Sequence, residues 1–252
     1  MLFFLTVFGS RAQKFQMGLK GGLSLPDLSS GAGASDVSKG YQTISGPDFA
    51  WVTDMKLSRK FSLETALEWS TQGGKKTGVQ TIPASEFAQF FPPGSNIQYV
   101  YANFTSTVRL QYLMLPLLLR YDMDLGVDGR WKLYVDGGIF GGYMVTGKGS
   151  ASGSSKVYKD KEETDPISST VVTFDSVGDI RNQLHRGNFG IDGNIGVQCQ
   201  FNSLALFAEG GGNYGFINLQ KNSENGINHT GSLIFRIGFL IQLLKPKIYT
   251  PR

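Results

Sequence analysis

Apolar and polar residues alternate along most of the chain, and the clearest example is the segment SLIFRIGFLIQL at residues 232–243. Successive side chains of a β-strand point to opposite faces, so Phe235 and Ile237 share one face while Arg236 lies on the other. A cation in the middle of an apolar run is costly where it meets hydrocarbon. The pattern is explained if the apolar face contacts lipid and Arg236 points into the polar interior of a barrel.

The same period of two recurs in seven further segments of the chain. Together the predicted strands cover residues 14–25, 47–58, 61–72, 107–122, 131–146, 187–200, 203–219 and 232–243. The connections between them are short after every second strand and long after the others, as in barrels with tight periplasmic turns and long external loops. We therefore predict an all-β fold, an eight-stranded antiparallel up-and-down transmembrane β-barrel. An even number of strands places both ends of the barrel in the periplasm.

The long connections are predicted to be external loops. The longest follows the fifth strand, and within it the phrase STVVTFDS (169–176) predicts a strand that continues above the membrane. Such a loop can hold a partner or a surface ligand.

The beginning of the sequence, MLFFLTVFGSRAQKF, resembles a secretory signal. Residues 2–8 form an apolar centre, and Ser10 and Ala12 flank Arg11 in a small-x-small cleavage pattern. A basic leading segment is missing, which favours a start codon further upstream or a sequence trimmed at this end; a short hydrophobic first strand is the alternative. We predict a signal peptide at 1–12, the barrel at 13–245 and a C-terminal periplasmic tail at 246–252.

Composition is consistent with many short strands. The chain has 33 glycines and 12% aromatic residues, whereas charged residues make up 17%, against about 25% in typical soluble domains. The net charge of +4 comes from scattered lysines and arginines, so no nucleic-acid partner is expected. Cys199 is the only cysteine, which excludes an intramolecular disulfide. No apolar stretch approaches the roughly 20 residues of a membrane-spanning helix.

The strand pattern also predicts which charged side chains point inward. The basic set is Lys20, Lys56, Arg120, Lys132 and Arg236, and the acidic set is Asp54, Glu64, Glu68, Asp136, Asp192 and Glu209. Side chains fill the interior of an eight-stranded barrel, and buried charges are stable only when they are paired. We therefore predict a lumenal charge network that plugs the barrel, with no catalytic residue, cofactor or metal site.

Four segments together resemble the PorT-like outer-membrane β-barrel family of Gram-negative bacteria. They are GLKGGLSL (18–25), FSLETALEWSTQGGKK (61–76), QYLMLPLLLRYD (111–122) and LYVDGGIFGGYMVTG (133–147). The most specific of them is the YLxLPLLL-type strand with Pro116. The resemblance implies an eight-stranded barrel in the outer membrane, and some members of the family are implicated in protein export by the type IX secretion route.

Three classes of function are compatible with the sequence. The first, which we favour, is a non-enzymatic barrel that acts as an anchor, a scaffold or a loop-mediated binding protein; its partners would be outer-membrane lipid and a protein held by the external loops. The second is an outer-membrane enzyme acting on lipid or peptide at the external rim, where His229 lies near Ser223, Glu224 and Ser232 in sequence. The third is a soluble lipocalin-like binder, which would carry its charges on the outside.

Overall fold

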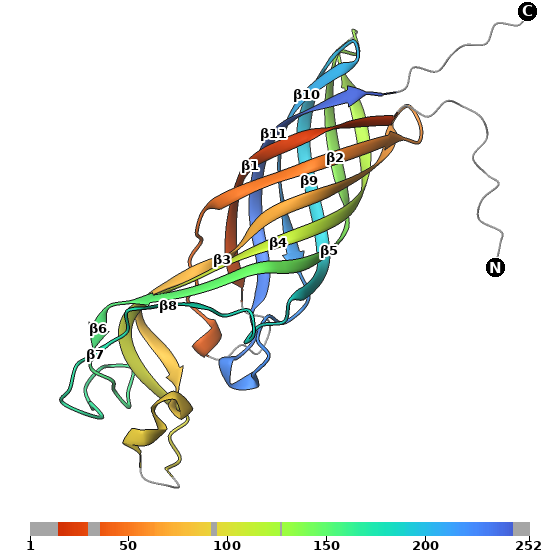
Figure 1. Cartoon of the computed structure of the whole chain (residues 1–252). Helices are drawn as coiled ribbons and strands as arrows, with labels where there is room; N and C mark the ends of the chain where they lie inside the picture. Colours follow the sequence, from red (N-terminus) through yellow and green to blue (C-terminus); the bar gives the residue numbers. More distant parts are fainter. Residues whose placement is uncertain (1–14, 30–35, 92–94, 127, 244–252) are drawn as a thin grey trace, which may run out of the picture.

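Eight long strands form a closed antiparallel ring in the computed structural model, which describes residues 15–29, 36–91, 95–126 and 128–243. The strands are β1 (Phe15–Ser29), β2 (Gly46–Lys56), β3 (Phe61–Pro83), β4 (Tyr99–Leu125), β5 (Trp131–Ser152), β9 (Gly187–Phe201), β10 (Leu204–Gly215) and β11 (His229–Gln242). Each pairs with its neighbour in the chain, β1 pairs with β11, and the ring is complete (Figure 1). The prediction of an eight-stranded up-and-down barrel is confirmed.

The two faces of the barrel have the reverse of the polarity found in soluble proteins. On β11, Ile237 is 71% exposed on the outer face, whereas the neighbouring Arg236 is 2% exposed on the inner face. The outer face carries exposed leucine, isoleucine, phenylalanine and tryptophan side chains on all eight strands. An apolar outer band with a polar interior is the pattern of a transmembrane barrel. A lipocalin requires the opposite arrangement, so the lipocalin-like alternative is wrong.

Three strands continue far beyond this apolar band. β4 has 27 residues, a contour length on the order of 90 Å, although a tilted strand crosses a membrane with about 9–11 residues. β3 and β4 stay paired from Gln72↔Leu110 to Pro83↔Tyr99. Figure 1 shows β3, β4 and β5 projecting together from one end of the barrel, opposite the end with the tight turns. Transmembrane barrels have tight periplasmic turns and long extracellular connections, so we call the described residues within 71–111 and 145–180 the extracellular extension.

The extension corrects the prediction that long loops follow the third and fifth strands. β8 (Ser176–Asp179) pairs with β5, and β6 (Ser154–Ser155) pairs with β7 (Val172–Thr173). The strand predicted within STVVTFDS is therefore two short strands separated by a break. The remaining elements are the 3-10 helices η1 (Asp36–Ser38), η2 (Ala84–Phe90) and η3 (Ser223–Asn225).

Three clusters of buried apolar residues lie along the axis of the molecule. The lumen cluster is Ala50, Val52, Ala66, Tyr134, Ala205, Phe207 and Leu240. The mouth cluster, where the barrel meets the extension, is Leu28, Leu110, Tyr112, Met114, Phe140, Met144, Leu184 and Leu219. The tip cluster, in the extension, is Ile82, Ala84, Val100, Ala102 and Val157.

In the part of the chain that the structure describes, no helix is long and apolar enough to span a membrane. The predicted signal peptide at 1–12 and the predicted tail at 246–252 lie outside the described residues.

Candidate functional site

Arg236 is the centre of the ion pairs inside the barrel. Its guanidinium lies 2.5 Å from the carboxylate of Asp48 and 2.6 Å from that of Glu68. A third carboxylate, Glu209, is 3.4 Å away. Glu209 also lies 3.0 Å from the Lys20 amine, which in turn is 2.8 Å from Glu64. Arg236 and Lys20 therefore hold four carboxylates from β2, β3 and β10 together in one layer.

A second layer of charges lies nearer the tight turns. Asp122 accepts a hydrogen bond of 2.8 Å from Arg120 and one of 2.5 Å from Lys56. Lys132, at 3.8 Å from Asp122, and Asp54, at 3.7 Å from Lys56, complete the layer. Arg120 connects it to the first layer, because its guanidinium also lies 3.7 Å from Glu64. It stacks on the Tyr134 ring at 3.5 Å, and Tyr134 donates a hydrogen bond to Glu209.

Asp136 and Asp192 have no ion-pair partner among the described residues. The amide of Asn194 lies between them and donates to both carboxylates, at 2.8 Å to Asp136 and 3.2 Å to Asp192. The structure thus places all the residues of the predicted lumenal set inside the barrel. Lys56 and Lys132 are the most exposed of the set, with side chains 15% and 21% accessible near the rim.

The predicted set omits two central members of the network, Asp48 and Asp122. Both are almost completely buried and both bind a guanidinium. The strand pattern contains the signal that would have found them, because Asp48 shares the parity of Asp54 on one strand and Asp122 shares the parity of Arg120 on another.

The described interior is occupied by these pairs and by the lumen and mouth clusters. Above the charge layers, Gln72 donates to both Asn213 and Ser232 at 3.3 Å, which links β3, β10 and β11 across the barrel. The mouth cluster follows directly, with Leu110, Tyr112, Met114 and Leu219 fully buried. This arrangement joins the barrel walls to each other instead of presenting groups to an open channel.

His229 does not form a catalytic group with Ser232 or Glu224. His229 and Ser232 are three positions apart on β11, so their side chains point to opposite faces of the strand. His229 stacks against Tyr214 at a ring distance of 5.7 Å, whereas Ser232 points inward and contacts Asn213. The carboxylate of Glu224 accepts a hydrogen bond from Ser85 instead. Within the described ranges, no group of three or more His, Cys, Asp or Glu residues could hold a metal ion.

The extracellular extension contains a cleft of about 610 Å³. It lies between two apolar regions: Leu28, Leu184 and Leu219 of the mouth cluster form one side, and Ile82 with Phe87, Phe104 and Phe174 forms the other. The edge strand β8 lines it, as do Lys76 and Gln80 of β3.

Lys76 is buried against this cleft. Its amine donates a hydrogen bond to the Val37 carbonyl and lies 4.5 Å from the centre of the Tyr41 ring. Removal from water disfavours the charged form and lowers the pKa of Lys76 to about 8. Burial similarly raises the pKa of Tyr41 to about 12.

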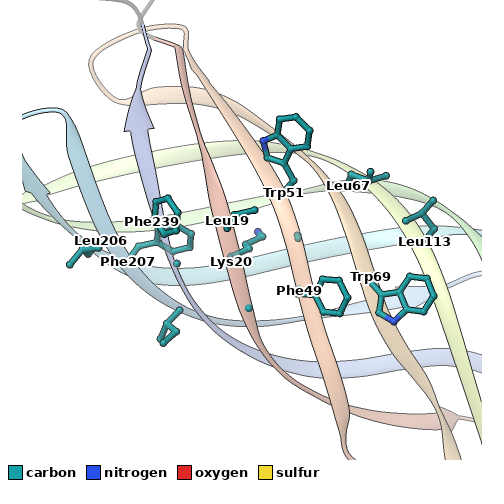
Figure 2. Close-up of a pocket in the computed structure, with 14 residues that line it drawn as sticks. Leu19, Lys20, Phe49, Trp51, Leu67, Trp69, Leu113, Leu206, Phe207 and Phe239 are labelled. Carbon is teal, nitrogen blue, oxygen red and sulfur yellow. The ribbon is translucent and has the colours of Figure 1, made fainter.

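A second concave region lies on the outer face of the barrel (Figure 2). It measures about 870 Å³, and Figure 2 shows Phe49 and Trp51 of β2 and Trp69 of β3 among its walls. Gly21 of β1, which is paired with Phe49, lines the same region and adds no side chain to it. The walls are almost entirely apolar, as expected of a surface that contacts acyl chains.

A closed barrel with an apolar outer band and a buried ionic interior defines the class of outer-membrane β-barrel proteins. The family model described as "outer membrane protein beta-barrel domain" matches residues 10–221, and the chain belongs to this family. The protein is located in the outer membrane.

Several solved outer-membrane proteins are similar to this chain at low sequence identity. Neisserial surface protein A is 12% identical, with 92% of this chain and 100% of that chain covered and a TM-score of 0.39. Ail, the attachment invasion locus protein of Yersinia pestis, is 10% identical, covering 90% of this chain and 98% of its own, with a TM-score of 0.38. The outer membrane protease OmpT from Escherichia coli is 10% identical, with coverages of 91% and 97% and a TM-score of 0.33. No curated protein matches the chain.

Proposed function

We propose that this protein is a non-enzymatic outer-membrane anchor whose lumen is closed and whose extracellular extension is the binding surface. The single observation that carries the proposal is the contrast between the interior of the barrel and the extension beyond it. Inside the barrel, Arg236, Lys20 and Arg120 form ion pairs with carboxylates of the same barrel. Outside it, three paired strands hold an open cleft well above the apolar band.

The closed lumen argues against a general diffusion pore. Buried ion pairs are costly to break, because removing one partner leaves an uncompensated charge in a medium of low polarity. Several ion pairs connect strands that are not neighbours in the ring, such as β3 and β11, and the mouth cluster covers them. Water and solutes would therefore have no continuous polar path between the two ends.

Single-channel recording in planar bilayers tests this part of the proposal. The purified barrel should insert and yet give no stable large conductance, while a general porin in the same membrane gives steady openings. Steady nanosiemens-scale openings by this protein would contradict the proposal.

We also propose a more specific role for this anchor, as an accessory in protein secretion. This role rests on the four segments that resemble the PorT-like family. The test is genetic. A strain that lacks the protein should accumulate export substrates in the periplasm, and the full-length protein should restore their export. A barrel shortened between Gln72 and Leu110, which are paired across β3 and β4, should not restore export if the extension contacts the partner. Normal export in the deletion strain would contradict this role.

A further inference from the structure

The cleft in the extension differs from the lumen in the way its cation is held. In the lumen, each cation lies within 4.0 Å of at least one carboxylate. Lys76 is only 7% exposed, yet it forms no ion pair with any acidic residue in the described part of the chain. Its contacts are a neutral carbonyl oxygen and the face of an aromatic ring.

An ammonium group in these surroundings still lacks a counter-charge. It has three N–H donors, of which the Val37 carbonyl takes one. Two carboxylates line the cleft, Glu86 and Asp179, and neither lies within 4.0 Å of the Lys76 amine; Asp179 is paired with Arg181 at 2.6 Å. The charge of Lys76 is therefore available to whatever enters the cleft.

The walls of the cleft indicate the rest of the ligand. Phe104 and Phe174 stack face to face with ring centres 4.4 Å apart, and Phe87 and Ile82 lie on the same side. A volume of about 610 Å³ falls within the range of roughly 300–1,000 Å³ that holds small molecules. Aromatic walls with one fixed cation match a ligand that has a flat apolar body and one negative group.

We infer that the cleft between β3 and β8 binds a small aromatic organic acid, whose carboxylate pairs with Lys76 and whose ring packs against Phe87, Phe104 and Phe174. The inference rests on the proposed function, because it names the class of ligand for the binding surface of the extension. It assigns Lys76 as the residue that recognises the negative charge.

The experiment compares two probes of the same shape, 2-naphthoate and the neutral 2-naphthamide, by saturation-transfer NMR with the full-length protein in lipid nanodiscs. The wild type should bind naphthoate about tenfold more tightly than naphthamide, since a charge-assisted hydrogen bond is stronger than a neutral one. Lys76→Met should bind the two probes equally. Lys76→Arg should keep part of the preference.

Lys75→Met is the matched control, because Lys75 is the exposed neighbour on the opposite face of β3. It should retain the full preference for naphthoate. Unchanged binding of naphthamide by Lys76→Met shows that the cleft is still folded. A full preference for naphthoate in Lys76→Met, or no binding of either probe by the wild type, would overturn the inference. Neither of these binding results bears on the conductance measurement, which tests the closed lumen of the proposed function separately.

Discussion

Arg236 shows how a single charged residue becomes compatible with an apolar strand. Its neighbours on β11 face lipid, while its own guanidinium reaches carboxylates on three other strands: Asp48 on β2, Glu68 on β3 and Glu209 on β10. Replacing it leaves several buried carboxylates without a cation, and this is more costly than losing one favourable contact.

Arg236→Met should therefore lower the free energy of unfolding by about 3–5 kcal/mol. The measurement is urea unfolding in lipid vesicles, followed by tryptophan fluorescence. Arg109→Met is the control: Arg109 is exposed and bonds to the Ser45 carbonyl, so its loss should change stability by no more than about 0.5 kcal/mol. Adding Glu68→Gln to Arg236→Met should recover part of the loss. Equal stability of the two single variants would show that the network contributes nothing.

Gly138 allows a second test at a single residue, in this case of how closely β4 and β5 approach each other. It points inward on β5 beside Leu118 of β4, and a Cβ atom there would overlap the backbone carbonyl of Leu117. Gly138→Ala should destabilise the barrel by about 1–3 kcal/mol in the same urea assay, because backbone atoms must move to make room. Gly141→Ala, on the lipid face of the same strand with nothing within 4 Å, should be neutral or slightly stabilising. A neutral Gly138→Ala would mean that β4 and β5 are less closely paired than described.

At the scale of elements, the barrel strands could be predicted from the sequence, whereas of the extension only the strand within STVVTFDS was predicted, and there the structure has two short strands. Lipid on one side and a polar lumen on the other require alternation, and this requirement identifies both the strands and their inward residues. Above the membrane both faces of a strand meet water or protein, so the alternation lapses. The adjacent Lys75 and Lys76 carry the same charge on opposite faces. Only the fold shows that one of them is buried against Val37 and Tyr41, far away in sequence.

The extension is expected to open independently of the barrel. Phe174 holds the short strands β7 and β8 to the sheet through its stacking on Phe104 and a backbone hydrogen bond to Gly153. Phe174→Ala should raise hydrogen exchange at 172–179 by roughly 10- to 100-fold, because local opening loses an aromatic contact. Exchange in β1 and β11 should not change. Val177→Ala is the control, since Val177 is 80% exposed; faster exchange throughout the barrel in Phe174→Ala would contradict this independence.

At the scale of the whole molecule, the tryptophans report how the barrel lies in the bilayer. Trp131 is the first residue of β5, at the end with the tight turns, and it is 51% exposed. Trp51 is 54% exposed and lies at the centre of β2. The spacing between Trp51 and the end of β2 at Lys56 corresponds to about 12 Å of depth for a tilted strand.

These positions predict a difference in quenching by brominated lipids, measured on variants that retain one tryptophan each and carry phenylalanine at the other two positions. Bromine near the middle of the acyl chains should quench Trp51 more strongly, whereas bromine near the headgroups should quench Trp131 more strongly. Aqueous iodide should affect neither to a comparable extent, since both rings face hydrocarbon. Strong quenching of Trp51 by iodide with none by the lipids would mean that the apolar band meets water, and the inward placement of Arg236 and its partners would then lose its physical reason.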